Sequence, residues 1–249
     1  MIVSPTLLAC VVVAQSAWSM SAGSEKLSFR DISRSGPPAD ASPVAWESTG
    51  PSFAAAYTRE GVRRFHRVTA DLARASSFEY AGPVNSTVAP GGDRALRLEG
   101  RYEYRRYFLD DLFTRGLDVG VGVQGMGRRL SLTRSTSTAE HVQADTSAAV
   151  GATVAARWHR SPRWTAEVAW INGGAALHET ESQDGARAFE HSQWGGAWFT
   201  DLSMRVSVRL ASPWWLSAEY LATGEGTATD HDSFALDRRR FIVGVTHAR

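Results

Sequence analysis

The segment from Trp198 to Leu210 alternates between apolar and polar side chains over its whole length. Even-numbered positions are mostly apolar, whereas the odd-numbered positions include Asp201, Arg205 and Arg209. Successive side chains of a β-strand point to opposite faces, so this period of two predicts one strand with two unlike faces. Strands of soluble proteins usually have about five or six residues, whereas a tilted strand needs about 9–11 residues to cross a bilayer. The segment is therefore long enough to span a membrane.

The same alternation recurs along most of the chain, and it is sharpest between Ala95 and Tyr107. Charged residues share one face of that segment, and mostly leucine and tyrosine side chains share the other face. An amphipathic helix would place its apolar residues three or four positions apart, whereas here they lie two apart. Further alternating segments occur at 67–72, 117–124, 146–159, 164–171, 214–220 and 241–247. The chain is therefore predicted to be all-β.

The connectors between these segments alternate in length. Long polar connectors are expected at 76–94, 133–144, 180–195 and 225–237, and shorter ones at 60–61, 106–115, 160–163 and 211–213. Outer-membrane barrels have this arrangement, with long outer loops and short periplasmic turns. The predicted fold is an antiparallel up-and-down transmembrane β-barrel. The alternative, a soluble antiparallel barrel or sandwich, would turn its apolar face inward.

The number of strands follows from pairing the weaker segments near the N-terminus. Eight strong strands are expected between residues 63 and 248, and Phe53–Glu60 adds another through a tight turn at Glu60 and Gly61. Because bacterial barrels have an even number of strands, a tenth is expected at Lys26–Ile32, with 33–51 as a loop or linker. Ten strands are favoured. The alternative is an eight-stranded barrel in which the first 60 residues form an extension or plug.

In a membrane barrel the apolar face meets lipid and the polar face points into the lumen. Both signs of charge alternate on the polar face, which predicts paired charges that plug a narrow interior. The predicted lumen charge network contains Arg67, Asp71, Arg97, Glu99, Arg101, Glu103, Arg105, Asp118, Arg157, Glu167, Asp201, Arg205, Arg209 and Glu219. Amphipathic aromatic rings favour the headgroup level. The predicted membrane-interface aromatics are Trp158, Trp164, Trp198, Trp214 and Trp215.

Composition and the N-terminus limit the class of protein further. The net charge is only +1, so no nucleic-acid partner is expected. No apolar run of about 20 residues follows the first 25, which excludes a spanning helix there. Residues 1–21 are predicted to be a signal peptide, because Leu7–Ala14 is a short apolar core followed by small residues. Residues 22–249 are then the barrel, and Cys10, the single cysteine, lies in the leader.

Taken together, the leader, the alternating strands and the alternating connectors resemble the small bacterial outer-membrane β-barrel proteins, the class of the OmpA membrane domain and OmpW. The resemblance is one of pattern and covers about residues 25–249. It implies an outer-membrane location, with outer-membrane lipid and the barrel assembly machinery as partners. Barrels of this class usually end in an aromatic residue that the assembly machinery recognises, whereas this chain ends in Arg249.

Two segments contain residue types that are found in ligand sites. Gly120–Gly125 spells G-x-G-x-x-G, but a dinucleotide site needs a helix next, and this sequence continues as a strand, so no cofactor is predicted. The inward glycines would instead leave room for neighbouring arginines. Acidic residues and a histidine between 179 and 191 lack the spacing of metal ligands, so no metal site is predicted.

The last long connector holds the weak catalytic candidates Asp230, His231, Asp232 and Ser233. A histidine beside an aspartate can activate a water, as in the ten-stranded omptin-type barrel proteases, which this motif resembles. The spacing of His231 and Ser233 also resembles the His-x-Ser of barrel lipid A deacylases. The second acidic pair of the former and the supporting glutamate of the latter are missing, so a polar loop is the favoured interpretation.

The sequence predicts a membrane barrel more firmly than it predicts an activity. The favoured role is structural or an interaction at the surface, through loops that meet an unknown ligand, on a barrel whose lumen is plugged by charge. The alternatives are an enzyme acting at the rim, of the omptin or lipid A deacylase kind, and a narrow pore.

Overall fold

The fold was obtained as a computed structural model. It describes residues 15–33, 44–61, 63–76, 78–81, 94–109, 116–135, 140–161, 163–184, 187–228 and 232–248. Within these ranges the chain forms β-strands and no helix. No described segment is a helix long and apolar enough to cross a membrane.

Long strands make up nearly all of the described chain. They are β1 (Gln15–Ser33), β2 (Val44–Glu60), β3 (Arg64–Ala75), β4 (Phe78–Ala81), β5 (Arg94–Leu109), β6 (Leu117–Ser135), β7 (Glu140–Ser161), β8 (Trp164–Asp184), β9 (Arg187–Ala211), β10 (Trp214–Ala228) and β11 (Asp232–Ala248).

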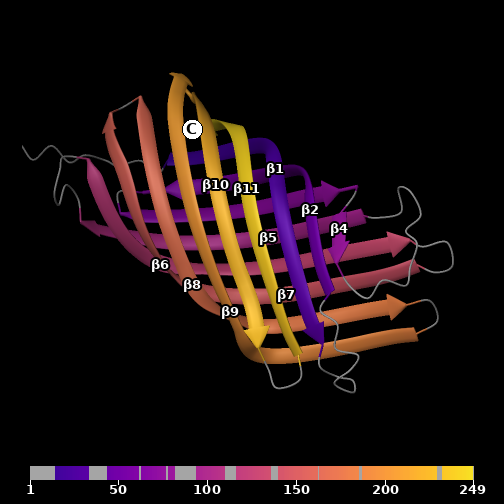
Figure 1. The fold of residues 1–249 in the computed structure, drawn as a ribbon. Helices are drawn as coiled ribbons and strands as arrows, with labels where there is room; N and C mark the ends of the chain where they lie inside the picture. Colours follow the sequence, from indigo (N-terminus) through magenta and orange to yellow (C-terminus); the bar gives the residue numbers. More distant parts are fainter. Residues whose placement is uncertain are drawn as a thin grey trace, which may run out of the picture.

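The strands close into one antiparallel barrel. Apart from the short β4, each strand pairs with the next one along the chain. β1 pairs on one side with β2 and on the other with β11, so the sheet has no free edge there. Figure 1 shows β1 between these two strands. The short β4 and the longer β3 both pair with β2, one beyond the other, and therefore count as one strand of the barrel. The predicted ten-stranded antiparallel barrel is confirmed.

The first strand is longer than expected and begins inside the predicted leader. The sequence placed a strand at Lys26–Ile32, opposite Phe53–Glu60. In the structure Phe53–Glu60 pairs instead with Gln15–Ala22, and Lys26 lies opposite Thr49. Cleavage after Ser21, at the end of the predicted signal peptide, would therefore remove paired residues of β1. The boundary of the leader stays a prediction, which N-terminal sequencing of the exported protein tests.

Several predicted long connectors are partly strand. β8 and β9 continue to Asp184 and Arg187, which pair with each other, although the sequence predicted a connector over 180–195. β6, β7 and β11 likewise extend into segments predicted as connectors. Backbone hydrogen bonds hold a hairpin together whatever its side chains are, so a polar composition does not end a strand.

The two faces of the strands have the burial opposite to that of a soluble protein. Along β5 the charged side chains of Arg97 and Arg105 are each only 1% exposed, whereas Leu98 is 49% exposed. Along β9 Asp201 is fully buried and Val206 is 49% exposed. The polar face therefore lines the interior, and the soluble alternative, which needs an apolar interior, does not describe this fold.

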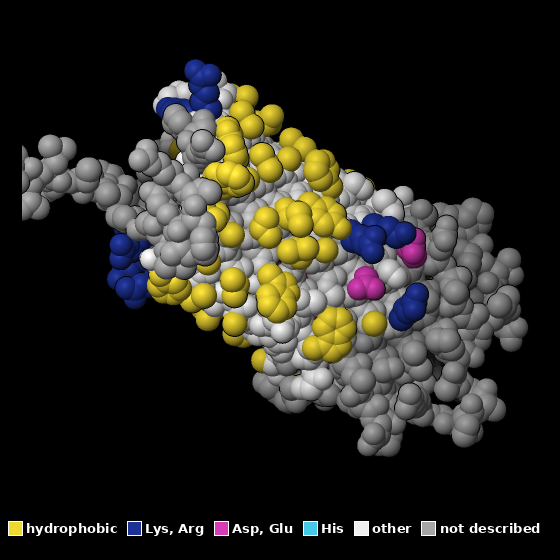
Figure 2. Space-filling model, turned by 60° about the vertical axis from the view of Figure 1, so that its left-hand side comes forward, with side chains coloured by type: hydrophobic (Ala, Val, Ile, Leu, Met, Phe, Trp, Pro, Cys, Tyr) yellow, Lys and Arg dark blue, Asp and Glu magenta, His cyan; other side chains and the backbone are white. Residues whose placement is uncertain are grey.

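The outer surface carries an apolar belt. Valine, leucine, methionine, phenylalanine and tryptophan side chains from most of the strands are exposed on it. Figure 2 shows these side chains gathered over the middle of the barrel wall, with charged side chains at its borders. One border charge pair joins Lys26 of β1 to Glu47 of β2, both about half exposed. A belt of this kind matches the band that lipid covers in outer-membrane barrels.

Close packing of β6 against β5 explains part of the glycine-rich motif. A Cβ atom on Gly122 would lie 1.9 Å from the carbonyl oxygen of Tyr104, and one on Gly120 would lie 2.8 Å from the Tyr107 ring. These glycines leave room for the β5 backbone and for Tyr107, not for arginines as the sequence suggested. The strand continues to Ser135, so the motif lacks the helix that a dinucleotide site needs.

Candidate functional site

The barrel interior is filled by ion pairs that join opposite walls. Arg67 of β3 pairs with Glu219 of β10, and Arg101 of β5 pairs with Asp201 of β9. In the circular strand order, four steps separate the members of each pair. A side chain can pair with another across the lumen only when the interior is narrow, as it is in barrels of about eight to ten strands.

The central cluster is built around Arg97 and Glu99. Arg97 donates two parallel hydrogen bonds to Glu25 of β1, from Nε at 2.6 Å and from Nη2 at 2.5 Å. It also pairs with Asp71 of β3. Glu99 accepts a hydrogen bond from Nη1 of Arg238 at 2.5 Å and pairs with Arg101. Such two-pronged arginine–carboxylate contacts fix both distance and orientation.

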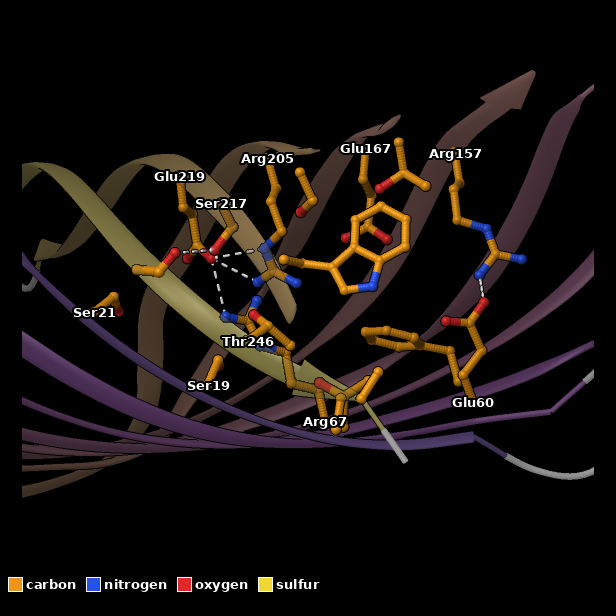
Figure 3. A pocket seen from close by; sticks show the side chains of 18 of the residues that line it. Ser19, Ser21, Glu60, Arg67, Arg157, Glu167, Arg205, Ser217, Glu219 and Thr246 are labelled. Carbon is orange, nitrogen blue, oxygen red and sulfur yellow. Dashed lines mark hydrogen bonds and ion pairs between the residues drawn. The ribbon is translucent and has the colours of Figure 1, made fainter. Parts of the chain in front are cut away.

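A second cluster surrounds Glu219 at the boundary with the open end of the lumen. Its carboxylate accepts hydrogen bonds from Arg205 at 2.5 Å, from Arg67 at 2.9 Å and from Arg240 at 3.3 Å. Arg240 also pairs with Asp71 at 2.9 Å, which connects this cluster to the central one. Figure 3 shows Arg67 and Arg205 converging on Glu219.

Further pairs line the two ends of the interior. Towards the short connectors, Arg105 pairs with Glu103 at 2.5 Å and with Glu167 at 2.8 Å. Arg157 pairs with Asp118 at 2.8 Å, and its guanidinium lies over the Tyr107 ring, 4.3 Å from the centroid. Towards the long connectors, Arg128 pairs with Glu225 at 2.5 Å.

Apolar side chains close the lumen beyond the charges. One buried cluster, towards the long connectors, contains Leu27, Phe29, Ala75, Ala95, Leu130, Leu132 and Leu236. A second, against β7, β8 and β9, contains Met126, Ala149, Ala155, Ala169, Ile171, Ala197 and Phe199. The interior is therefore a packed core of charged and apolar layers.

A cavity of about 370 Å³ occupies the short-connector end of the lumen. Its walls include Ser19, Phe65, Thr165, Trp215 and Thr246, each close to the end of its strand. Beyond the Arg67–Glu219 contact, the two small cavities found deeper in the lumen measure only about 20 Å³ each. Such a space holds about one water. The lumen thus opens at one end and is closed farther in.

The structure places nearly every residue of the predicted lumen charge network in the interior. Each of them except Arg209 makes an ion pair across or along the lumen. Arg209 lies near the end of β9 with an exposed side chain and makes no ion pair with a described residue, so its assignment to the network is corrected. The strand passes the end of the packed interior before Arg209, where water solvates the charge.

The predicted interface aromatics divide between the two faces. Trp158, Trp164 and Trp214 are exposed near the short connectors, and Trp198 is exposed in the half of β9 nearer the long connectors. Trp215 instead lines the interior cavity, which corrects its assignment to the membrane interface. Adjacent residues of a strand point to opposite faces, so Trp214 and Trp215 cannot both face outward in a regular strand.

Sequence reasoning missed several interior charges, namely Glu25, Arg128, Asp145, Glu225, Arg238 and Arg240. The last two fall where a loop was expected to pass into the final strand. A signal was available, because Leu236, Arg238, Arg240 and Ile242 share one face of β11 and alternate with exposed side chains.

The catalytic candidates of the last long connector are not brought into a site by the described part of the fold. Asp230 and His231 lie outside the described residues. Asp232 and Ser233 begin β11, opposite Ser33 and Ile32 of β1, which places their backbone at the rim with the long connectors. No group of three or more metal-ligating side chains occurs among the described residues.

Comparison with known proteins supports the fold. No protein-family model matches the chain, and no curated protein matches its sequence. The outer membrane protease OmpT from Escherichia coli has a TM-score of 0.72 and 7% identity, over 96% of this chain and 98% of that one. The translocator domain of the autotransporter NalP from Neisseria meningitidis has a TM-score of 0.43 and 11% identity, over 94% and 88%.

Ail, the attachment invasion locus protein of Yersinia pestis, has a TM-score of 0.34 and 9% identity, over 95% of this chain and 99% of its own. The likeness to OmpT extends over the whole barrel. The resemblance to bacterial outer-membrane β-barrels that the sequence pattern predicted is therefore confirmed for the fold.

Proposed function

We propose that this chain is an integral outer-membrane barrel that does not conduct ions and that serves as a rigid platform for its long connectors. The role is structural or an interaction at the cell surface. The observation that carries the proposal is the set of buried ion pairs between opposite walls, such as Arg67 with Glu219 and Arg101 with Asp201. Their side chains occupy the path that an ion would have to follow.

The apolar belt and the fold support the outer-membrane location. Exposed apolar side chains on this scale are costly in water, and for that reason monomeric soluble proteins seldom expose large contiguous apolar patches. Lipid removes that cost, and closed barrels leave no unpaired strand edge inside a bilayer. Outer-membrane lipid and the barrel assembly machinery are the partners that such a protein requires.

Single-protein recordings in planar bilayers test the closed lumen. The wild-type protein is expected to give a flat trace, because ion pairs and apolar side chains fill its interior beyond the Arg67–Glu219 contact. A variant that truncates only this contact and its neighbour, Arg67→Ala with Arg205→Ala, is expected to stay closed, because the cluster around Arg97 and Glu99 and the apolar layer towards the long connectors remain in place. Regular single-channel steps from the wild-type protein would contradict the proposal and favour the narrow pore.

Rim catalysis is the second candidate, and the likeness to the fold of OmpT over 96% of the chain is the observation that favours it. Asp232 begins β11 at the rim with the long connectors, and Asp230 and His231 precede it in the sequence. Purified protein assayed with peptides and with lipid A tests it. An activity that His231→Ala abolishes would support catalysis, and an activity that survives the substitution would exclude His231 from it.

A further inference from the structure

The cavity at the short-connector end is larger than a structural plug requires. At about 370 Å³ it lies within the range of small-ligand sites, which is roughly 300–1,000 Å³. Glu60 and His159 on its border have side chains about 40% exposed, so the cavity is reached from solution. In barrels of this class the short connectors face the periplasm, so a ligand would enter from that side.

Three arginines share Glu219 at the inner wall of the cavity, whereas the other two glutamates of its lining, Glu60 and Glu167, pair with Arg157 and Arg105. Arg67, Arg205 and Arg240 converge on the single carboxylate of Glu219. Asp71 compensates part of this excess, but it also pairs with Arg97. An anion placed against this wall would find guanidinium donors that the protein itself does not fully satisfy.

Arg205 is the donor best placed for such an anion. Its Nε and Nη2 both donate to Glu219, which leaves Nη1 without a partner among the described side chains. The side chain is 20% exposed, more than either Arg67 or Glu219 beside it. Glu219 holds the guanidinium in place, so binding an anion would cost little side-chain entropy.

The remaining wall of the cavity is aromatic and rich in hydroxyl groups. Trp215 and Phe65 supply flat apolar surfaces, and the Phe65 ring is backed by the Arg105 guanidinium, 4.9 Å from its centroid. Ser21 and Ser217 donate weak bonds to backbone carbonyls at 3.4 and 3.3 Å, and their oxygens remain able to accept. Figure 3 shows both serines on the same side of the cavity as Glu219.

We propose that this cavity binds a small organic acid, with the carboxylate on Arg205 and Arg67 and the apolar part against Trp215 and Phe65. The inference goes beyond the proposed function, because a plugged barrel needs no ligand. The two proposals fail separately, because an absence of ligand binding would leave the expected flat conductance trace unchanged.

Isothermal titration calorimetry of the full chain in detergent micelles tests the proposal, with phenylacetate as the probe. Saturable binding is expected, and phenylacetamide, which has the same size without the charge, should bind at least about tenfold more weakly, the loss typical of a hydrogen bond to a charged group. Inorganic phosphate should also bind more weakly, because it cannot use the aromatic wall. Equal affinity for all three would overturn the proposal.

Substitutions then locate the site. Arg205→Gln should weaken phenylacetate binding by about tenfold or more. Arg209→Gln removes an exposed arginine of the same strand outside the cavity and should leave binding unchanged. Ser207→Phe fills the cavity without removing a charge and should also abolish binding, with heat-modifiable gel migration showing that each variant folds. Binding unaffected by both Arg205→Gln and Ser207→Phe would place the ligand elsewhere and refute the assignment.

Discussion

Glu99 shows what a single residue of the interior contributes. Its carboxylate is buried and faces Arg97, Arg101 and Arg238, which come from two strands on different parts of the barrel wall. A charge in such a position is stable only when it is paired, because the interior solvates it poorly. Loss of the carboxylate would leave several guanidinium groups without their common partner.

Substitution Glu99→Gln is therefore expected to lower the free energy of unfolding by about 3–5 kcal/mol, the usual cost of removing one partner from a buried ion pair. Urea unfolding in lipid vesicles measures it. Glu47→Gln is the matched control, because Glu47 pairs with Lys26 at the surface, where a pair contributes about 0–1 kcal/mol. Equal losses for the two variants would show that the interior pairs do not stabilise the barrel.

Glycines on β6 give a second test at this scale. Gly122→Ala should destabilise the barrel, because the added methyl group would lie 1.9 Å from the Tyr104 carbonyl oxygen and the two strands would have to separate. Gly127→Ala is the control, since no atom lies within 4 Å of its added Cβ. Thermal unfolding of both variants, followed by the loss of heat-modifiable migration, measures the difference. A Gly122→Ala barrel as stable as the wild type would contradict the close approach of β5 and β6.

At the scale of elements, β9 has one face for lipid and one for the interior. Val206 is outward and exposed near the middle of the belt, and Leu210 is outward at the end of the strand. Val206→Arg should cost about 2–4 kcal/mol in a bilayer, and Leu210→Arg about 0–1 kcal/mol near the interface. Unfolding in vesicles tests this contrast. A similar cost at both positions would mean that lipid does not cover the belt as proposed.

The elements also show how far the sequence predicts the fold. The alternation in 95–107 and 198–210 correctly assigned the inner and outer faces of β5 and β9, because side-chain direction in a strand is a local property. Strand ends were predicted poorly. β1 starts at Gln15, and β9 starts at Arg187, because pairing with neighbouring strands extends both through residues of weak pattern. Local sequence does not record that pairing.

At the scale of the whole molecule, the belt and the closed sheet predict behaviour typical of membrane barrels. The folded chain should resist unfolding by detergent at room temperature and migrate differently on a gel after boiling, because the closed sheet has no edge from which to open. It should also be recovered with the outer-membrane fraction of the cells that express it. Recovery of folded protein in the soluble periplasm would contradict the membrane location.

The candidate site was predictable in its kind but not in its geometry. The charged residues of β5 and β9 were expected to be inside and paired with the opposite sign. Which pairs form depends on how the closed sheet brings distant strands face to face. Arg101 and Asp201 are one hundred positions apart, and three strands of the barrel, β6, β7 and β8, lie between theirs. The cavity next to Glu219 could not be predicted, since its walls come from eight strands.

The amino-acid sequence by itself determined which side chains face lipid and which face the lumen. A period of two fixes the two faces of every strand without reference to any other strand, and the length of the strands and the belt of apolar residues select a membrane as the solvent. Only the tertiary structure decided that Arg205 and Arg67 share Glu219 and that an open cavity lies beside them. Contacts across a lumen depend on closure and on the stagger of the strands, which are properties of the whole barrel.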